Sequence, residues 1–96
     1  MPVIRIHRYT VDPVDLDELL DRRIRLIDAI RMAHPGLAAT RLTRLPDGTF
    51  DDTWYWETAE DMEVALAAIG SFPEARATMS LTRGNMAQDG VVVSER

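Results

Sequence analysis

The sequence predicts an α+β fold whose elements follow the order strand, helix, strand, strand, helix, strand. Three observations predict it. Residues 3–10 alternate between apolar and polar side chains, which is typical of a half-buried strand. Two stretches, 13–33 and 58–79, repeat apolar residues at helical spacing. Between them, two β-prone runs flank a Pro-Asp-Gly turn triplet at 46–48, which is typical of an antiparallel hairpin.

The first strand is expected over residues 3–10. Because successive side chains of a strand point to opposite faces, Ile4 and Ile6 share one face. Arg5, His7 and Tyr9 share the other face. The pattern therefore places a cation, an imidazole and a phenol in one row, with neighbours about 6.6 to 7 Å apart by strand rise.

The first helix is expected to begin after Asp12, which can cap it, with Pro13 at the first helical position. It should end near Ala33, because the following His34 precedes a Pro-Gly pair that stops a helix. In this position His34 fits a cap at the negative end of the helix dipole. The expected apolar stripe is Leu16, Leu20, Ile24 and Ile27, flanked by Leu19, Leu26 and Ile30.

The second half of the chain begins with the hairpin strands, expected over 39–45 and 50–57. Thr58, with Asp61 three residues later, resembles a capping box and predicts the start of the second helix. A further helical turn or two is expected over 71–79, and the last strand over the valine run 91–93. The second helix has the apolar stripe Met62, Ala65, Leu66 and Ile69.

This order is the split β-α-β pattern of ferredoxin-like folds, in which both helices cover one face of an antiparallel sheet. We expect the other face to carry Tyr9 and, on one choice of register, Trp54 and Trp56. In the other register Thr53 and Tyr55 face the cleft instead. Exposed aromatic surface of this size favours a partner, so a second copy of the chain is expected to cover it, giving a homodimer through the sheet face.

Composition and charge narrow the functional classes. With 96 residues, 46% apolar and 28% charged, the chain is expected to form one globular domain over 1–96. A net charge of −5, without a basic run, argues against nucleic-acid and anionic membrane partners. The start of the chain, MPVIRIHRYT, lacks a signal-peptide apolar run, so a cytoplasmic location is expected.

The residue types that are missing remove several chemistries. The chain has no cysteine, which excludes disulfides, thiolate nucleophiles and thiolate metal sites. It has no lysine, which excludes Schiff-base chemistry such as lysine-anchored pyridoxal phosphate. Neither a metal-binding pattern of histidines and carboxylates nor a glycine-rich phosphate loop is present. We therefore expect no metal and no cofactor.

Four segments resemble a known superfamily: IRIHRYTV, HPGL, RLPDGTFDDTWYWET and FPEARATMSLT. With them the chain resembles the dimeric α/β-barrel superfamily, most closely its antibiotic-biosynthesis-monooxygenase-like (ABM) branch, over nearly its whole length. The resemblance implies a ferredoxin-like subunit that pairs into a dimeric α/β barrel. It leaves several activities open, because such proteins include cofactor-free quinol monooxygenases, haem-degrading enzymes and isomerases.

The haem-degrading members differ from this chain at the positions that matter. Those members use an asparagine on the first strand, a tryptophan and a haem-ligating histidine. The matching positions here are His7, Ala65 and either Ala75 or Arg76. The resemblance therefore does not extend to haem ligation.

His7 is the leading candidate for catalysis, because an imidazole titrates near neutrality and can take a proton from a phenol-like substrate. In this hypothesis Arg5 stabilises the developing negative charge and Tyr9 positions the substrate ring. The alternative is a histidine that packs at a dimer interface. A proton-shuttling isomerase would use His7 in the same way without oxygen.

Trp54 and Trp56 share a face and could form an aromatic wall for a substrate, although core or interface packing explains them as well. Asp52 shares that face and could orient His7 or pair with Arg5; solvated charge after a turn is the alternative. The sequence therefore predicts a protein that binds a small aromatic molecule between sheet and helices, as a cofactor-independent monooxygenase. The second hypothesis is a non-catalytic dimeric ligand-binding or interaction module.

Overall fold

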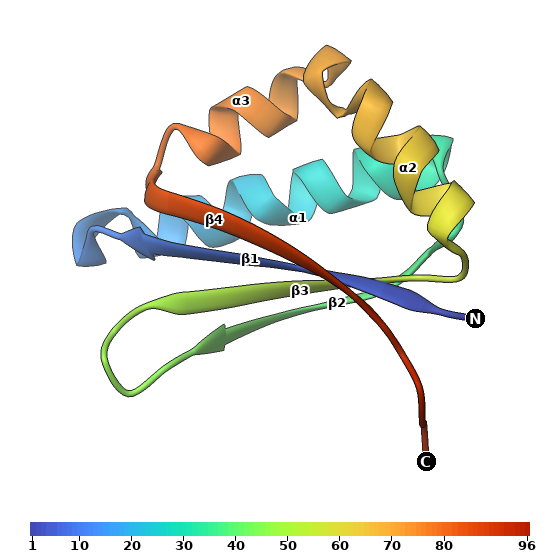
Figure 1. Cartoon of the computed structure of the whole chain (residues 1–96). Helices are drawn as coiled ribbons and strands as arrows, with labels where there is room; N and C mark the ends of the chain where they lie inside the picture. Colours follow the sequence, from blue (N-terminus) through green and yellow to red (C-terminus); the bar gives the residue numbers. More distant parts are fainter.

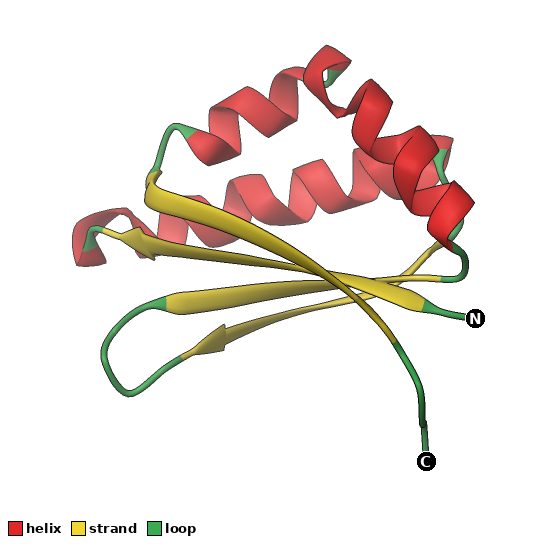
Figure 2. Cartoon of the chain, viewed as in Figure 1, coloured by secondary structure: helices red, strands yellow, loops and turns green.

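The computed structural model describes residues 1–96 and confirms the ferredoxin-like order of elements. One antiparallel sheet in the strand order β2-β3-β1-β4 is covered on one side by the helices (Figures 1 and 2). None of the helices is both long and apolar enough to span a membrane. The elements are β1 (Val3–Val11), a 3₁₀ turn (Pro13–Asp15), α1 (Leu16–Ala33), β2 (Leu37–Arg44), β3 (Phe50–Trp56), α2 (Ala59–Ala68), a second 3₁₀ turn (Ile69–Ser71), α3 (Pro73–Met79) and β4 (Thr82–Val91).

Capping groups define the helix ends as predicted. The Asp12 carboxylate accepts a hydrogen bond from the Val14 N–H at 3.1 Å, at the 3₁₀ turn that leads into α1. The Thr58 hydroxyl oxygen accepts one from the Asp61 N–H at 3.0 Å and starts α2. At the other end of α1, the His34 N–H donates to the Ile30 carbonyl at 2.7 Å.

The buried stripe of α1 differs from the predicted one. Leu20 and Ile24 are 39% and 58% exposed. Of the predicted stripe the helix buries Ile27, together with the three predicted flanking residues Leu19, Leu26 and Ile30. Both stripes satisfy helical spacing, because apolar residues cover a wide arc of this helix. The arc that is buried is the one that contacts the sheet, and this contact includes the ion pair between Arg23 of α1 and Asp52 of β3.

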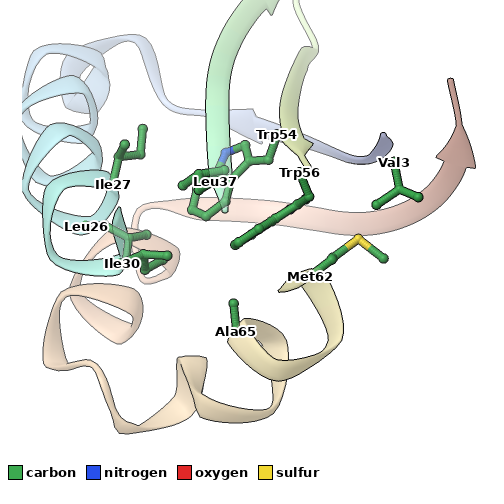
Figure 3. Packing of buried hydrophobic residues seen from close by; sticks show 9 residues of the cluster. All are labelled: Val3, Leu26, Ile27, Ile30, Leu37, Trp54, Trp56, Met62 and Ala65. Carbon is green, nitrogen blue, oxygen red and sulfur yellow. The ribbon is translucent and has the colours of Figure 1, made fainter. Parts of the chain in front are cut away.

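The prediction that the aromatic residues lie on the open face of the sheet is wrong. Tyr9, Trp54 and Trp56 lie on the face that the helices cover, not on the open face. Figure 3 shows Trp54 and Trp56 among residues of α1 and α2. The alternation in β1 is as predicted, but its polar row faces the helices, while Ile4 and Ile6 face outward. Packing Tyr9 and the tryptophans inward buries more area than the two isoleucines offer.

The last strand is longer and earlier than predicted. β4 pairs with β1 from Thr82 opposite Val11 to Val91 opposite Val3, so the valine run mostly follows the strand. Its residues are largely polar and exposed. Because β4 is an edge strand held by main-chain hydrogen bonds to β1, it needs no apolar alternation, and periodicity could not find it.

Candidate functional site

Two adjoining hollows lie between the sheet and the helices. The inner cavity has a volume of about 50 Å³, and His7, Tyr9, Asp52 and Trp54 of the sheet and Leu26 of α1 are among its lining residues. The outer groove has a volume of about 500 Å³ and is more open. The two share His7, Ile69, Ala75 and Met79 as lining residues. His7 therefore lies where the two hollows meet.

Asp52 is the centre of a buried polar network. Its carboxylate accepts hydrogen bonds from the Tyr9 hydroxyl at 2.8 Å and the Trp54 indole N–H at 2.9 Å. Arg23 of α1 donates two more, from Nε at 2.9 Å and Nη2 at 2.8 Å. Asp52 is only 6% exposed, so the expectation of a solvated charge is wrong. A two-pronged arginine contact and two further donors compensate for burying the carboxylate.

The network also fixes the protonation state of Tyr9. Burial, followed by the negative charge of Asp52 and the hydrogen bond to it, raises the pKa of Tyr9 well above its ordinary value; Arg23 opposes this. Tyr9 therefore stays a protonated donor to Asp52 at physiological pH. Its hydroxyl oxygen can still accept a hydrogen bond from a ligand.

His7 differs from its neighbours because its side chain has no hydrogen-bond partner. It pairs with Asp52 across β1 and β3, and its ring centroid lies 6.1 Å from that of Trp54. Burial, and then the charge of Arg5, lower the pKa of His7 below 6.5, while Asp52 and Asp89 oppose the shift. A neutral imidazole with a free lone pair is therefore present at pH 7, as a general base requires.

Arg5 lies at the edge of the outer groove. Its Nη1 donates to both carboxylate oxygens of Asp89 on β4, each at 3.1 Å, so Asp89 and not Asp52 is its ion-pair partner. Its Nε is buried and has no hydrogen-bond partner. Arg76 of α3 lines the same groove. The groove thus combines apolar helix residues with two guanidinium groups, an arrangement suited to an electron-rich or anionic ring.

The structure brings together most of the predicted site residues. Arg5 and His7 line the outer groove, and His7, Tyr9, Asp52 and Trp54 line the inner cavity. Trp56 lines neither hollow: it is 1% exposed and belongs to the core (Figure 3). Of the two registers considered for β3, the one that points Trp54 toward the cleft is correct.

Sequence reasoning missed Arg23 and Arg76. Arg23 had a usable signal, because it lies four residues after Leu19 and three before Leu26, in the buried stripe of α1. An arginine at such a position requires a buried carboxylate partner. Arg76 had no comparable signal. No group of three or more histidine, aspartate or glutamate side chains in the chain could hold a metal ion.

Comparison with solved structures identifies the fold. The chain has a ferredoxin-like fold that it shares with several structures named as antibiotic biosynthesis monooxygenases and with SnoaB. SnoaB from Streptomyces nogalater, described as a cofactor-independent oxygenase, is 22% identical, with a TM-score of 0.76 over 98% of this chain and 95% of that one. A candidate antibiotic biosynthesis monooxygenase from Bordetella bronchiseptica is 15% identical, with a TM-score of 0.77 over 97% and 98%.

A third such structure, a candidate antibiotic biosynthesis monooxygenase from Deinococcus radiodurans, is 16% identical, with a TM-score of 0.74 over 98% of this chain and 95% of that one. No family model matches the sequence, and no curated protein matches it by sequence. The similarity is therefore one of fold, and at that level it confirms the resemblance seen in the sequence.

Proposed function

We propose that this protein is a cofactor-independent monooxygenase that oxidises a small phenol- or quinol-like aromatic molecule bound in the outer groove. The observation that carries the proposal is the unpaired imidazole of His7, whose lowered pKa keeps it neutral at the junction of the two hollows. The description of SnoaB, which has the same fold, as a cofactor-independent oxygenase supports it.

In the proposed reaction, His7 accepts the phenolic proton of the substrate. The resulting electron-rich phenolate reacts with dioxygen at a ring carbon that bears hydrogen, forming a carbon–oxygen bond, and His7 returns its proton to the peroxide. Loss of that ring hydrogen as a proton breaks the O–O bond. One oxygen atom stays as a quinone carbonyl and the other leaves as water, so the substrate supplies every electron and no cofactor is needed.

The other residues have supporting roles in this proposal. Arg5 stabilises the negative charge that develops on the substrate, since it lines the outer groove together with His7. Tyr9 and Trp54 line the inner cavity and not the outer groove, so in this proposal they hold Asp52 and the wall between the two hollows in place without contacting the ring. Asp52 acts through Tyr9 and Trp54, because its own oxygens already accept bonds from protein donors.

The test is oxygen uptake with a panel of planar phenols and quinols. His7→Ala should lower kcat/KM by about 10²- to 10⁴-fold, the usual contribution of a general base. His34→Ala is the matched control, because it removes the other histidine, which packs against Phe72 outside the cleft. Unchanged turnover in His7→Ala would remove the central claim. Substrate consumption without oxygen uptake would favour an isomerase.

We also propose that the chain forms a homodimer through the open face of its sheet. Ile4 and Ile6 lie on this face, and Met86 of β4, which is 70% exposed, lies beside Ile6. Light scattering should give a mass near twice 10.8 kDa, and Ile6→Arg should give the monomer mass. A dimer whose stability ignores every small molecule would favour the non-catalytic module instead.

A further inference from the structure

We propose that the inner cavity is a dioxygen-holding site, distinct from the groove that holds the aromatic ring. This inference rests on the proposed oxygenase function and names where its second substrate binds. The cavity is small. An apolar cavity that is known to bind benzene has a volume of about 150 Å³, and the inner cavity, with about 50 Å³, is too small for an aromatic ring. Dioxygen is slightly larger than a water molecule, whose share of liquid volume is about 30 Å³, and it fits.

The wall of the cavity offers few free polar groups. The polar groups of Tyr9, Arg23 and Trp54 that reach the cavity bond to Asp52, and His7 adds one imidazole without a partner. The surface left exposed inside is nearly all apolar. A buried water needs two to four polar partners, whereas a small apolar cavity stays dry and takes up apolar gases such as xenon. The wall therefore favours dioxygen over water.

The inner cavity also lies in the right place. The inner cavity and the outer groove share His7, Ile69, Ala75 and Met79, so a gas molecule in one lies next to a ring in the other. His7 borders both. The phenolate that it generates can pass an electron to dioxygen and form the carbon–oxygen bond without either molecule crossing bulk water. The same imidazolium can then return its proton to the peroxide oxygen.

Leu26 of α1 offers a way to fill the cavity without touching the groove. It is buried, lines the inner cavity and does not line the outer groove. Leu26→Phe adds volume on the cavity side, and Leu20→Phe is the control because it makes the same change on the exposed side of α1, at a residue that lines neither hollow. We expect Leu26→Phe to raise the KM for dioxygen about tenfold and to leave the KM for the aromatic substrate unchanged. Leu20→Phe should change neither.

A second measurement needs neither turnover nor a variant that folds. Crystals of the unmodified protein are pressurised with xenon, which should bind between His7 and Leu26. An ordered water there, or no xenon, would overturn the inference, as would an equal rise of both KM values in Leu26→Phe. Xenon in the cavity without oxygen uptake on any phenol would leave the gas site standing and reject the oxygenase. Oxygen uptake without a xenon site would support the oxygenase and reject the gas site.

Discussion

Two neighbouring regions of the cleft, one around Asp52 and one around His7, differ in how far their polar groups are hydrogen-bonded. Around Asp52, the carboxylate, the Tyr9 hydroxyl, the Trp54 indole and Arg23 bond to one another. Around His7, which pairs with Asp52 across the strands, the imidazole has no partner and the buried Nε of Arg5 has none either. Buried polar groups in proteins are normally paired, so the first region stabilises the fold and the second is available to a ligand.

A similar contrast separates two adjacent aspartates. Strand alternation sends Asp52 inward to Arg23, where the side chains are 8% and 12% exposed. It sends Asp51 to the open face, where it pairs with Arg8, whose side chain is 55% exposed. The two ion pairs have similar distances, 2.8 and 2.9 Å. Burial, not geometry, therefore decides how much the loss of each carboxylate destabilises the fold.

The largest expected effect follows from this difference. Asp52→Asn leaves the buried Arg23 guanidinium without a counter-charge, which should lower the free energy of unfolding by about 3–5 kcal/mol. Urea denaturation followed by circular dichroism measures it. Asp51→Asn is the matched control, and its change should be far smaller because solvent screens the Arg8 pair. Equal losses in the two variants would contradict a closed, buried network.

A smaller effect is expected from Tyr9→Phe, which removes one donor to Asp52 and leaves Arg23 and Trp54 in place. A hydrogen bond to a charged group is typically worth about 1.5–3 kcal/mol, and unfolding should show a loss in this range. Tyr55→Phe, on the opposite face of β3, serves as the control. In the Asp52→Asn background the Tyr9→Phe loss should shrink; full additivity would show that the two residues do not interact.

The last test concerns pH. Burial and Arg5 lower the pKa of His7, so below pH 6.5 the unfolded chain takes up a proton that the folded chain resists. The contribution of His7 to stability is therefore fully present above pH 6.5 and is lost as pH falls toward the lower folded pKa. Urea midpoints from pH 8 to 5 should fall less in His7→Gln than in the unmodified protein. Parallel curves for His7→Gln and the unmodified protein would place His7 in solvent.

The acid side of the activity profile gives an independent check. If His7 is the general base, kcat/KM should fall with acid at an apparent pKa below the 6.5 of free imidazole. An acid limb above 6.5 would point to a different base.

Features that depend on neighbouring residues, such as helix ends and strand alternation, could be predicted from the sequence. Features that depend on packing between distant elements, such as which face is buried, could not. Helix ends at Asp12, Thr58 and His34 depend on nearby capping groups, and they lie where expected. Which arc of α1 is buried depends on distant partners: the tryptophans of β3 against which it packs and the carboxylate of Asp52. The row of Arg5, His7 and Tyr9 follows from strand alternation alone, but the face it occupies follows from where the tryptophans pack.

The contact between His7 and Trp54 also provides an optical reporter inside the cleft. Trp54 borders the inner cavity, 6.1 Å from the imidazole, whereas Trp56, the other tryptophan, is enclosed in the core. A charged imidazolium quenches indole emission more strongly than a neutral imidazole does. Proton uptake by His7 should therefore lower the tryptophan emission of the unlabelled protein, and Trp54→Phe should remove that drop because Trp56 is enclosed in the core.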